Sequence, residues 1–203
     1  MFGMIKNSLF SQIEHRPSQT LNSETKGELS YEERRYEPGN YASVTISGKP
    51  FDEGSGEGAV KLLKYLGGSN EEGLQLGMTS PVSMSVRPSE EEGGSLQPTV
   101  EVQVRIPAQF QENIPKPTDE SIEIKRVEGF TVYSTQFGGY AKEAHYVEYA
   151  GKLREALGDT ERYQRDVYQC VGYDPPLKPI GRRNEVWFLK QEDVAPVARS
   201  GSQ

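Results

Sequence analysis

The sequence predicts an α+β fold made of two similar halves, and three observations support this prediction. Apolar and polar residues alternate in several short runs, as in strands that bury one face. Two longer segments carry apolar residues at spacings of three and four, as in amphipathic helices. A leucine pair in the first of these segments recurs 91 residues later, as Leu62 and Leu66 against Leu153 and Leu157. We therefore expect a unit of β-hairpin, helix and two further strands to occur twice and to share one core.

The expected elements follow in order along the chain. Two strands within 28–47 surround a turn at Glu37–Asn40, and further strands are expected at about 74–87, 99–106, 121–127, 130–137, 166–173 and 184–190. The first helix is expected over about 51–66, with Gly67-Gly68 ending it. Its first half contains Gly54, Gly56 and Gly58, each about 1 kcal/mol less favourable than alanine in a helix. We therefore expect that half to fray. A second helix is expected over about 140–157, with a buried stripe that includes Tyr146, Ala150 and Leu153.

The chain divides into an arm, a domain and a tail. Residues 1–27 are expected to form an N-terminal arm that ends in residues typical of loops. Residues 191–203 are expected to form a disordered tail. The domain between them spans 28–190, with pseudo-repeats at about 28–106 and 121–190.

Composition limits the class of protein. The chain has 203 residues and a net charge of −7, and it has no long basic stripe, so a nucleic-acid partner is not expected. A single cysteine, Cys170, is typical of a reducing compartment. No apolar run approaches the roughly 18 residues that span a membrane, and no signal-peptide cleavage pattern occurs. These features predict a cytoplasmic protein, which we expect to be a monomer.

Three segments contain specific sequence motifs in addition to any periodic pattern. They are Gly-Met-Thr-Ser-Pro-Val at 77–82, Phe-Gly-Gly-Tyr-Ala-Lys-Glu-Ala at 137–144, and Gly-Tyr-Asp-Pro-Pro-Leu-Lys-Pro-Ile-Gly-Arg-Arg-Asn-Glu-Val-Trp at 172–187. Together with the start at 1–10 and the stretch at 106–110, they resemble the SOUL / heme-binding-protein family, and above all the branch called heme-binding protein one. The resemblance covers nearly all of residues 1–190.

This resemblance implies both a fold and an activity. The fold is a distorted β-barrel of about eight or nine strands, built from two βαββ-like repeats and flanked by two helices. The activity is noncovalent binding of heme and free porphyrins in an apolar cleft near the first helix, with basic side chains at its rim. We therefore expect a cytosolic tetrapyrrole buffer or carrier that is not an enzyme and that requires no cofactor.

The first helix supplies the first candidates for the binding site. A porphyrin is a flat apolar disc with two propionates, so its site needs an apolar slot and one or two cations at the mouth. Val60 and Leu63 are candidates for the slot. Lys64 can line it with its stem while its ammonium stays in water. The alternative is that Lys64 is a solvated helix lysine.

The C-terminal motif supplies the other candidates. Lys178, after the Pro175-Pro176 turn, is the second candidate cation that the resemblance implies, and Arg182 is a further one. Tyr173 is either a slot-lining or a core aromatic residue. Close relatives carry an arginine in the first half of the first helix, where this chain has Gly56, so affinity is expected to be lower unless another residue compensates.

No side chain stands out as an iron ligand. His15 lies in the expected arm, and His145 lies on the polar face of the second helix, so both are interpreted as surface histidines. Cys170 and Met78 are interpreted as core residues. We therefore predict that heme is not bound through histidine, and that metal-free protoporphyrin binds as well.

Two other functions remain open. In this branch a released N-terminal segment acts as a chemoattractant on formyl-peptide-type receptors, and residues 1–21 align with it, although residues 15–18 depart from the expected aromatic pattern. An enzyme on the same scaffold is the third possibility. No nucleophile–base pair, zinc-ligand spacing or phosphate-binding loop in the sequence supports it.

Overall fold

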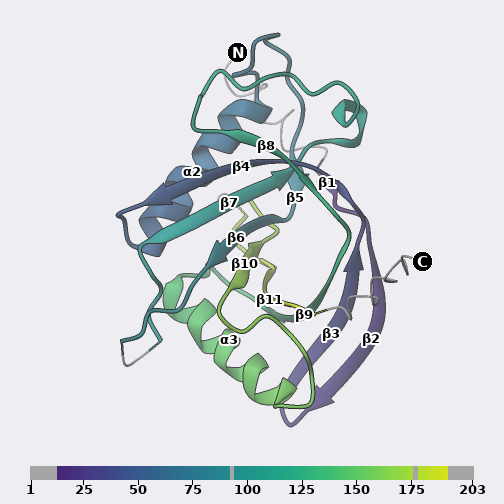
Figure 1. Ribbon diagram of the computed structural model, residues 1–203, viewed down its shortest axis with the longest axis vertical. Coiled ribbons are helices and arrows are strands. Elements are labelled where there is room, and N and C mark those ends of the chain that lie inside the picture. Colours follow the sequence, from purple (N-terminus) through teal and green to yellow (C-terminus); the bar gives the residue numbers. More distant parts are fainter. Residues whose placement is uncertain (1–12, 92–93, 176–177, 192–203) are drawn as a thin grey trace, which may run out of the picture.

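The computed structural model describes residues 13–91, 94–175 and 178–191, and it shows a nine-stranded antiparallel sheet that curls into a half-barrel (Figure 1). The predicted α+β class, with a distorted barrel and two helices, is confirmed. In sheet order the strands are β2 (Ser18–Lys26), β3 (Leu29–Tyr36), β9 (Phe130–Phe137), β11 (Asn184–Leu189), β10 (Tyr168–Gly172), β6 (Val82–Val86), β7 (Thr99–Arg105), β4 (Gly39–Ser47) and β8 (Glu123–Val127). The helices are α2 (Phe51–Leu66) and α3 (Glu143–Leu157), with a 3₁₀ turn at Ala108–Phe110.

The sheet has an internal two-fold pattern. Each half of the chain supplies two strands, a helix and two strands: β3, β4, α2, β6 and β7, then β8, β9, α3, β10 and β11. Without β2, the sheet order is symmetric about the central pair of β6 and β10. Each strand of one half lies as far from this centre as its counterpart in the other half, on the opposite side. The core is therefore shared between the halves, as one hydrophobic cluster that includes residues of both.

The prediction that each half begins with a β-hairpin was wrong. β3 pairs with β2 and β9, whereas β4 pairs with β7 and β8, so the two consecutive strands are not hydrogen-bonded to each other. β8 and β9, which are also consecutive in the sequence, likewise do not pair with each other. A connection of two residues that includes Pro38 is short enough for a hairpin. Each of these strands instead has one partner from the other half, β9 for β3 and β8 for β4, and those pairings close the shared core.

Part of the expected N-terminal arm belongs to the sheets. β2 is an edge strand whose nine residues are all exposed, and it pairs with β3 along its length. β1 (Glu14–His15) forms a short parallel pair with β5 (Thr79–Ser80). Residues 1–12 and the predicted tail from 192 onward lie outside the described residues.

The glycines of α2 bring the helix close to the sheet. α2 packs on β4 and β7, and it is helical from Phe51, including the half that was expected to fray. A Cβ at Gly58 would lie 2.6 Å from Cγ2 of Val102, and one at Gly54 would lie 3.2 Å from Cγ1 of Val100. Both glycines are buried. Their lower helix propensity is therefore offset by a close contact that larger residues would prevent.

α3 packs against the other half of the sheet, on β3, β9 and β11. It begins at Glu143, three residues later than expected. It buries Tyr146, Ala150, Leu153 and Leu157 of the predicted stripe, whereas Val147, also predicted there, is half-buried. The two helices thus lie against different parts of the curled sheet (Figure 1).

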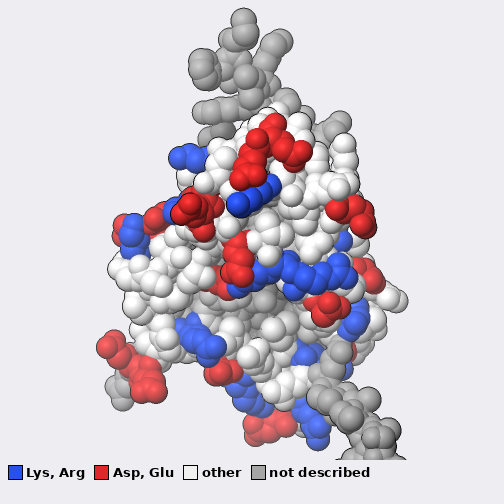
Figure 2. Space-filling view, turned by 45° about the horizontal axis from the view of Figure 1, so that its top comes forward, with Lys and Arg blue, Asp and Glu red and all other residues white. Residues whose placement is uncertain are grey.

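Charged side chains on the surface are mixed in sign. On the face shown in Figure 2, acidic and basic side chains lie next to each other. Several of them form local ion pairs, such as Lys125 with Glu101 at 3.1 Å and Lys152 with Glu148 at 3.1 Å. Neither helix of the described chain is long and apolar enough to cross a membrane.

Candidate functional site

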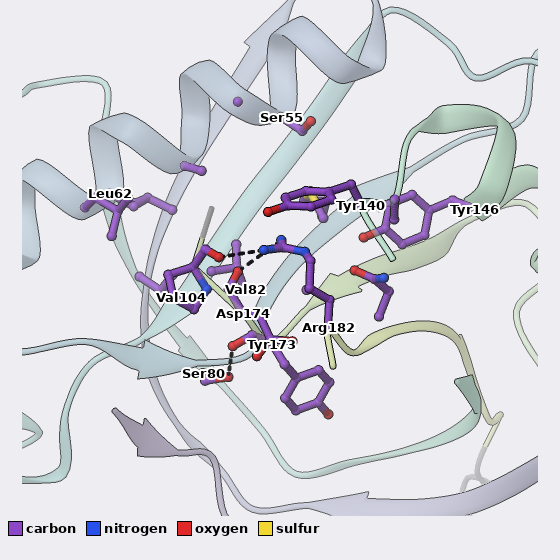
Figure 3. Close-up of a pocket in the computed structure, with 18 of the residues that line it drawn as sticks. Ser55, Leu62, Ser80, Val82, Val104, Tyr140, Tyr146, Tyr173, Asp174 and Arg182 are labelled. Atoms are coloured by element: carbon purple, nitrogen blue, oxygen red, sulfur yellow. Dashed lines mark hydrogen bonds between the residues drawn. The ribbon is translucent and has the colours of Figure 1, made fainter. Parts of the chain in front are cut away.

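A cavity of about 490 Å³ lies beside α2, and loops from the second half of the chain complete it (Figure 3). This volume is within the range of small-molecule and cofactor sites. The wall opposite α2 includes residues 140–142, Tyr146 of α3, residues 173–175 and Arg182. Since both halves of the chain contribute, the cavity exists only in the assembled fold.

One face of α2 forms the first wall. Asp52, Gly56, Ala59 and Leu63 line the cavity, and their spacing of four, three and four residues places them on one side of the helix. The residues that face the sheet, such as Gly58 and Leu62, lie next to this side. Gly56 leaves open space: a Cβ there would meet nothing within 4 Å.

The floor of the cavity is apolar. Strands β6 and β7 contribute Val82, Met84 and Val104, and Met78 lies just before β5. Tyr146 closes the side towards α3. Apolar and thioether side chains of this kind suit the face of a flat, hydrophobic ligand.

Arg182 is a cation at the cavity wall without a carboxylate partner among the described residues. Its Nη1 donates to the carbonyl oxygens of Pro175 at 2.6 Å and Lys178 at 3.1 Å, and Nη2 donates to that of Asp174 at 3.4 Å. Its guanidinium lies 4.2 Å from the ring centroid of Tyr140. Figure 3 shows the Tyr140 ring between α2 and Arg182. The guanidinium thus donates to the backbone of the loop, and it forms no ion pair with an acidic side chain of the described residues.

A buried ionic network supports the cavity from behind. The hydroxyl of Tyr173 donates to Oε2 of Glu185 at 2.8 Å, and the tyrosine ring points away from α2 (Figure 3). Glu185 is fully buried and also accepts hydrogen bonds from Arg34, Arg183 and the indole of Trp187. Burial alone would raise the pKa of Glu185, but Arg34 and then Arg183 outweigh it and lower the pKa from its ordinary value. The network therefore fixes the segment that carries Tyr173.

The structure separates the six predicted site residues. Leu63, Tyr173 and Arg182 line the cavity. Val60 is 49% exposed, and neither Val60 nor Lys64, which is also exposed, is among the lining residues. Lys178 forms an ion pair with Asp174 at 2.8 Å and lines a neighbouring cavity of about 850 Å³.

Sequence reasoning missed two residues at the mouth, Tyr140 and Lys142. Both belong to the motif at 137–144, which was used for the resemblance but not for the site. The glycines at 138 and 139 before them mark a loop, and an exposed tyrosine and lysine directly after such a loop were the available signal.

The histidines and the cysteine lie away from this cavity. Nδ1 of His145 accepts a hydrogen bond from the backbone N–H of Lys142 at 3.0 Å, and His15 is exposed on β1. Cys170 is fully buried, and this burial raises the pKa of its thiol well above the ordinary value. Among the described residues, no group of three or more His, Cys, Asp or Glu side chains is placed to hold a metal ion.

Comparison with known proteins gives close relatives. The chain is 54% identical to Heme-binding protein 1 of Xenopus laevis over 190 residues, which are 94% of this chain and 99% of that protein. It is 53% identical to Heme-binding protein 1 of Bos taurus over 95% of this chain and all of that protein. Heme-binding protein 2 of Homo sapiens is 29% identical over 81% of this chain and 80% of its own length.

A structural likeness extends the fold beyond these relatives. The EcmrR C-terminal domain aligns with a TM-score of 0.51 at 14% identity, over 80% of this chain and 97% of that chain, which shows a shared fold alone. The family described as SOUL heme-binding protein matches residues 15–189, nearly the whole described chain. The resemblance found in the sequence is thereby confirmed: the chain belongs to the SOUL heme-binding protein family.

Proposed function

We propose that the cavity beside α2 binds heme and free porphyrins without a covalent bond, and that the protein acts as a tetrapyrrole buffer or carrier. One observation supports this most strongly. A mainly apolar cavity of about 490 Å³ has at its wall a guanidinium, that of Arg182, without a carboxylate partner in the described chain. The names of its relatives, Heme-binding protein 1 and 2, agree with this proposal.

In this proposal the apolar walls bind the ring and the cation binds a propionate. The ring would lie between the Gly56, Ala59 and Leu63 face of α2 and the strand floor. A propionate would replace the carbonyl oxygens that Arg182 now contacts, and a charge-assisted pair is stronger than a neutral hydrogen bond. Lys142 lines the same cavity and is a second candidate cation. Lys178 is less suited in this state, because Asp174 already neutralises it.

Iron is not needed for this mode of binding. Neither histidine lines the cavity, so ring burial and propionate pairing supply the affinity. Metal-free protoporphyrin should therefore bind about as well as hemin. An open, noncovalent site of this kind also allows release, as a buffer or carrier requires.

The test is a titration of the full chain with hemin and, separately, with protoporphyrin. Trp187 is the only tryptophan in the chain, so quenching of its emission reports binding, and absorbance gives a second readout. Arg182→Gln should weaken both ligands by about tenfold, the value of one charge-assisted hydrogen bond of roughly 1.5 kcal/mol. Arg126→Gln is the matched control, because Arg126 lies on β8 and pairs with Glu128 at 3.6 Å, away from the cavity.

Three results would contradict the proposal in different ways. Absence of saturable binding of both ligands would remove the tetrapyrrole function. Equal affinities of the Arg182→Gln and Arg126→Gln proteins would exclude Arg182 as the propionate partner. Binding of hemin alone, lost in His145→Ala, would show that iron ligation by a histidine dominates.

The alternative of a signalling peptide from residues 1–21 falls mostly outside the described residues. Its described part, from residue 13, includes β1 and the start of β2, so release of the peptide would require both strands to detach. Nothing in the described residues favours that function, and it is not proposed further.

A further inference from the structure

Four buried polar atoms without hydrogen-bond partners belong to three residues around Tyr41, two of them in the sheet and one, Arg16, directly after β1. They are Nε and Nη2 of Arg16, Nε of Arg105 and the hydroxyl oxygen of Tyr41, and they are four of the seven such side-chain atoms in the described residues. Tyr41 and Arg105 are cross-strand partners in β4 and β7, so their side chains leave the same face of the sheet. The Arg16 guanidinium lies 4.7 Å from the Tyr41 ring centroid. Since buried donors are usually satisfied, a group of this size indicates a missing partner.

Arg16 is buried as a charge without an anion. Its side chain follows β1, and the residue is only 7% exposed. Besides Tyr41, the rings of Tyr36 and Trp187 each lie 5.5 Å from its guanidinium. Ring faces attract a cation, but they do not satisfy its N–H groups as an oxygen would. Burial first, and the charge of Arg105 in addition, lower the pKa of Arg16 from its ordinary value.

The described residues around Arg16 carry more positive than negative charge, and none of their carboxylates pairs with Arg16 or Arg105. Arg16 lines the second cavity together with four other cations, Arg34, Lys178, Arg182 and Arg183, against two acids, Glu32 and Asp174. Three of those cations already have acidic partners, because Arg34 and Arg183 pair with buried Glu185 and Lys178 pairs with Asp174. In the described chain no carboxylate pairs with Arg16 or Arg105. The excess of positive charge attracts anions to this cavity although the whole chain is acidic.

We propose that Arg16 and Arg105 together hold a small oxyanion, such as inorganic phosphate or a carboxylate, beside Tyr41, where Arg16 borders the second cavity. Tyr41 and Arg105 lie behind Arg16 and do not line that cavity themselves. The oxygens of the anion would accept hydrogen bonds from both guanidinium groups and from the hydroxyl of Tyr41. Such bonds are strong in a site with little water. Arg16, Tyr41 and Arg105 do not line the cavity beside α2, and the proposal does not depend on tetrapyrrole binding.

Trp187 gives a direct readout of this site. It is the only tryptophan in the chain, and it lies 5.5 Å from the Arg16 guanidinium, so pairing of that charge with an anion should change its emission. The full chain is titrated with sodium phosphate while sodium chloride keeps the ionic strength constant, and parallel titrations use sulfate and acetate. We expect a saturable change with phosphate or acetate. A response to acetate alone would identify a carboxylate site, and a response to phosphate and sulfate a tetrahedral oxyanion site.

The variants decide whether the response comes from this cluster. Arg16→Gln and Arg105→Gln should each raise the half-saturating concentration at least tenfold, and Arg16→Lys, which keeps the charge but loses the fork of donors, should have an intermediate effect. Arg126→Gln should titrate as the unchanged protein does. The anion should also raise the melting temperature of the unchanged protein and not that of Arg16→Gln. If one glutamine variant does not fold, the other decides.

Two outcomes would overturn the proposal. One is the absence of a saturable response to any of the three anions. The other is an equal response in Arg16→Gln and in the unchanged protein, which would place the anion elsewhere.

Discussion

Replacing Gly56 by arginine should strengthen both α2 and the binding of a ligand that carries carboxylates. Gly56 lies in the helix, lines the cavity, and has open space where its Cβ would be. The resemblance to the family places an arginine at this position. The Cβ of an arginine there would meet no neighbouring atom within 4 Å.

The expected magnitudes follow from the local structure. Exchanging glycine for arginine within a helix gains about 0.8 kcal/mol of intrinsic propensity, which corresponds to a rise in melting temperature of about 2–3 °C for a chain of this size. A partly exposed pair between arginine and a propionate contributes about 1 kcal/mol, so the dissociation constant of protoporphyrin should fall about fivefold. The fall should become smaller at high salt, because exposed charges are screened.

Gly151 provides the matched control for this experiment. It lies within α3, a Cβ there also meets nothing within 4 Å, and it does not line the cavity. Gly151→Arg should therefore raise the melting temperature by a similar amount and leave the affinity unchanged. Protoporphyrin dimethyl ester, which has no free carboxylate, should not gain affinity in Gly56→Arg. The reasoning about the cavity mouth is refuted if both arginine variants bind protoporphyrin equally, or if the ester gains as much as the free acid.

Three further predictions concern packing, the buried ion pair and the thiol. Gly58→Ala should destabilise the protein by about 1–3 kcal/mol in thermal unfolding, because the new methyl group would lie 2.6 Å from Cγ2 of Val102; an unchanged melting temperature would contradict this. Arg34→Met should cost about 3–5 kcal/mol in urea unfolding, because it leaves Glu185 buried without its main partner. Burial raises the pKa of Glu185, but Arg34 and Arg183 together outweigh burial and lower it, so this carboxylate stabilises the fold above an unfolded pKa of about 4.3 and ceases to do so as the pH falls through its lowered pKa. Without Arg34 the pKa of Glu185 in the folded state should rise, so Arg34→Met should lose less of its free energy of unfolding on acidification than the unchanged protein does, and an equal loss in both would exclude the role given to this pair. Cys170 should react with iodoacetamide at neutral pH only after unfolding, as followed by mass spectrometry, because its thiol is fully buried and its pKa is raised; rapid labelling of the native protein would contradict this.

Local patterns predicted both helices and most strands, although β2 lies where an N-terminal arm was expected. α2 begins and ends where the leucine spacing and Gly67 place it, and β9 has the bounds expected from its alternation. These features depend on neighbours within a few residues, which the sequence displays directly. Periodicity also revealed the two halves, because Leu62 and Leu153 occupy equivalent buried places in their helices.

Strand pairing could not be predicted in the same way. The turn residues at 37–40 allow a hairpin as well as a corner, and the choice depends on contacts between residues far apart in sequence. β3 pairs with β9 from Tyr31 to Tyr36, and β4 pairs with β7 from Tyr41 to Ser47. Both pairings join segments more than 50 residues apart, so local turn chemistry carries little information about them.

Contacts between distant parts of the chain also decide which of the predicted site residues line the cavity. The apolar stripe of α2 has to face the sheet, but a stripe has two edges, and the sequence does not say which edge borders a cavity. The edge with Val60 and Lys64 was predicted, because a lysine there suits a propionate, whereas in the structure Gly56, Ala59 and Leu63 line the cavity. That space is defined by Arg182 and Tyr140, which reach it from loops of the other half of the chain. The cavity is therefore a property of the shared core, and it becomes visible only once the two halves are joined.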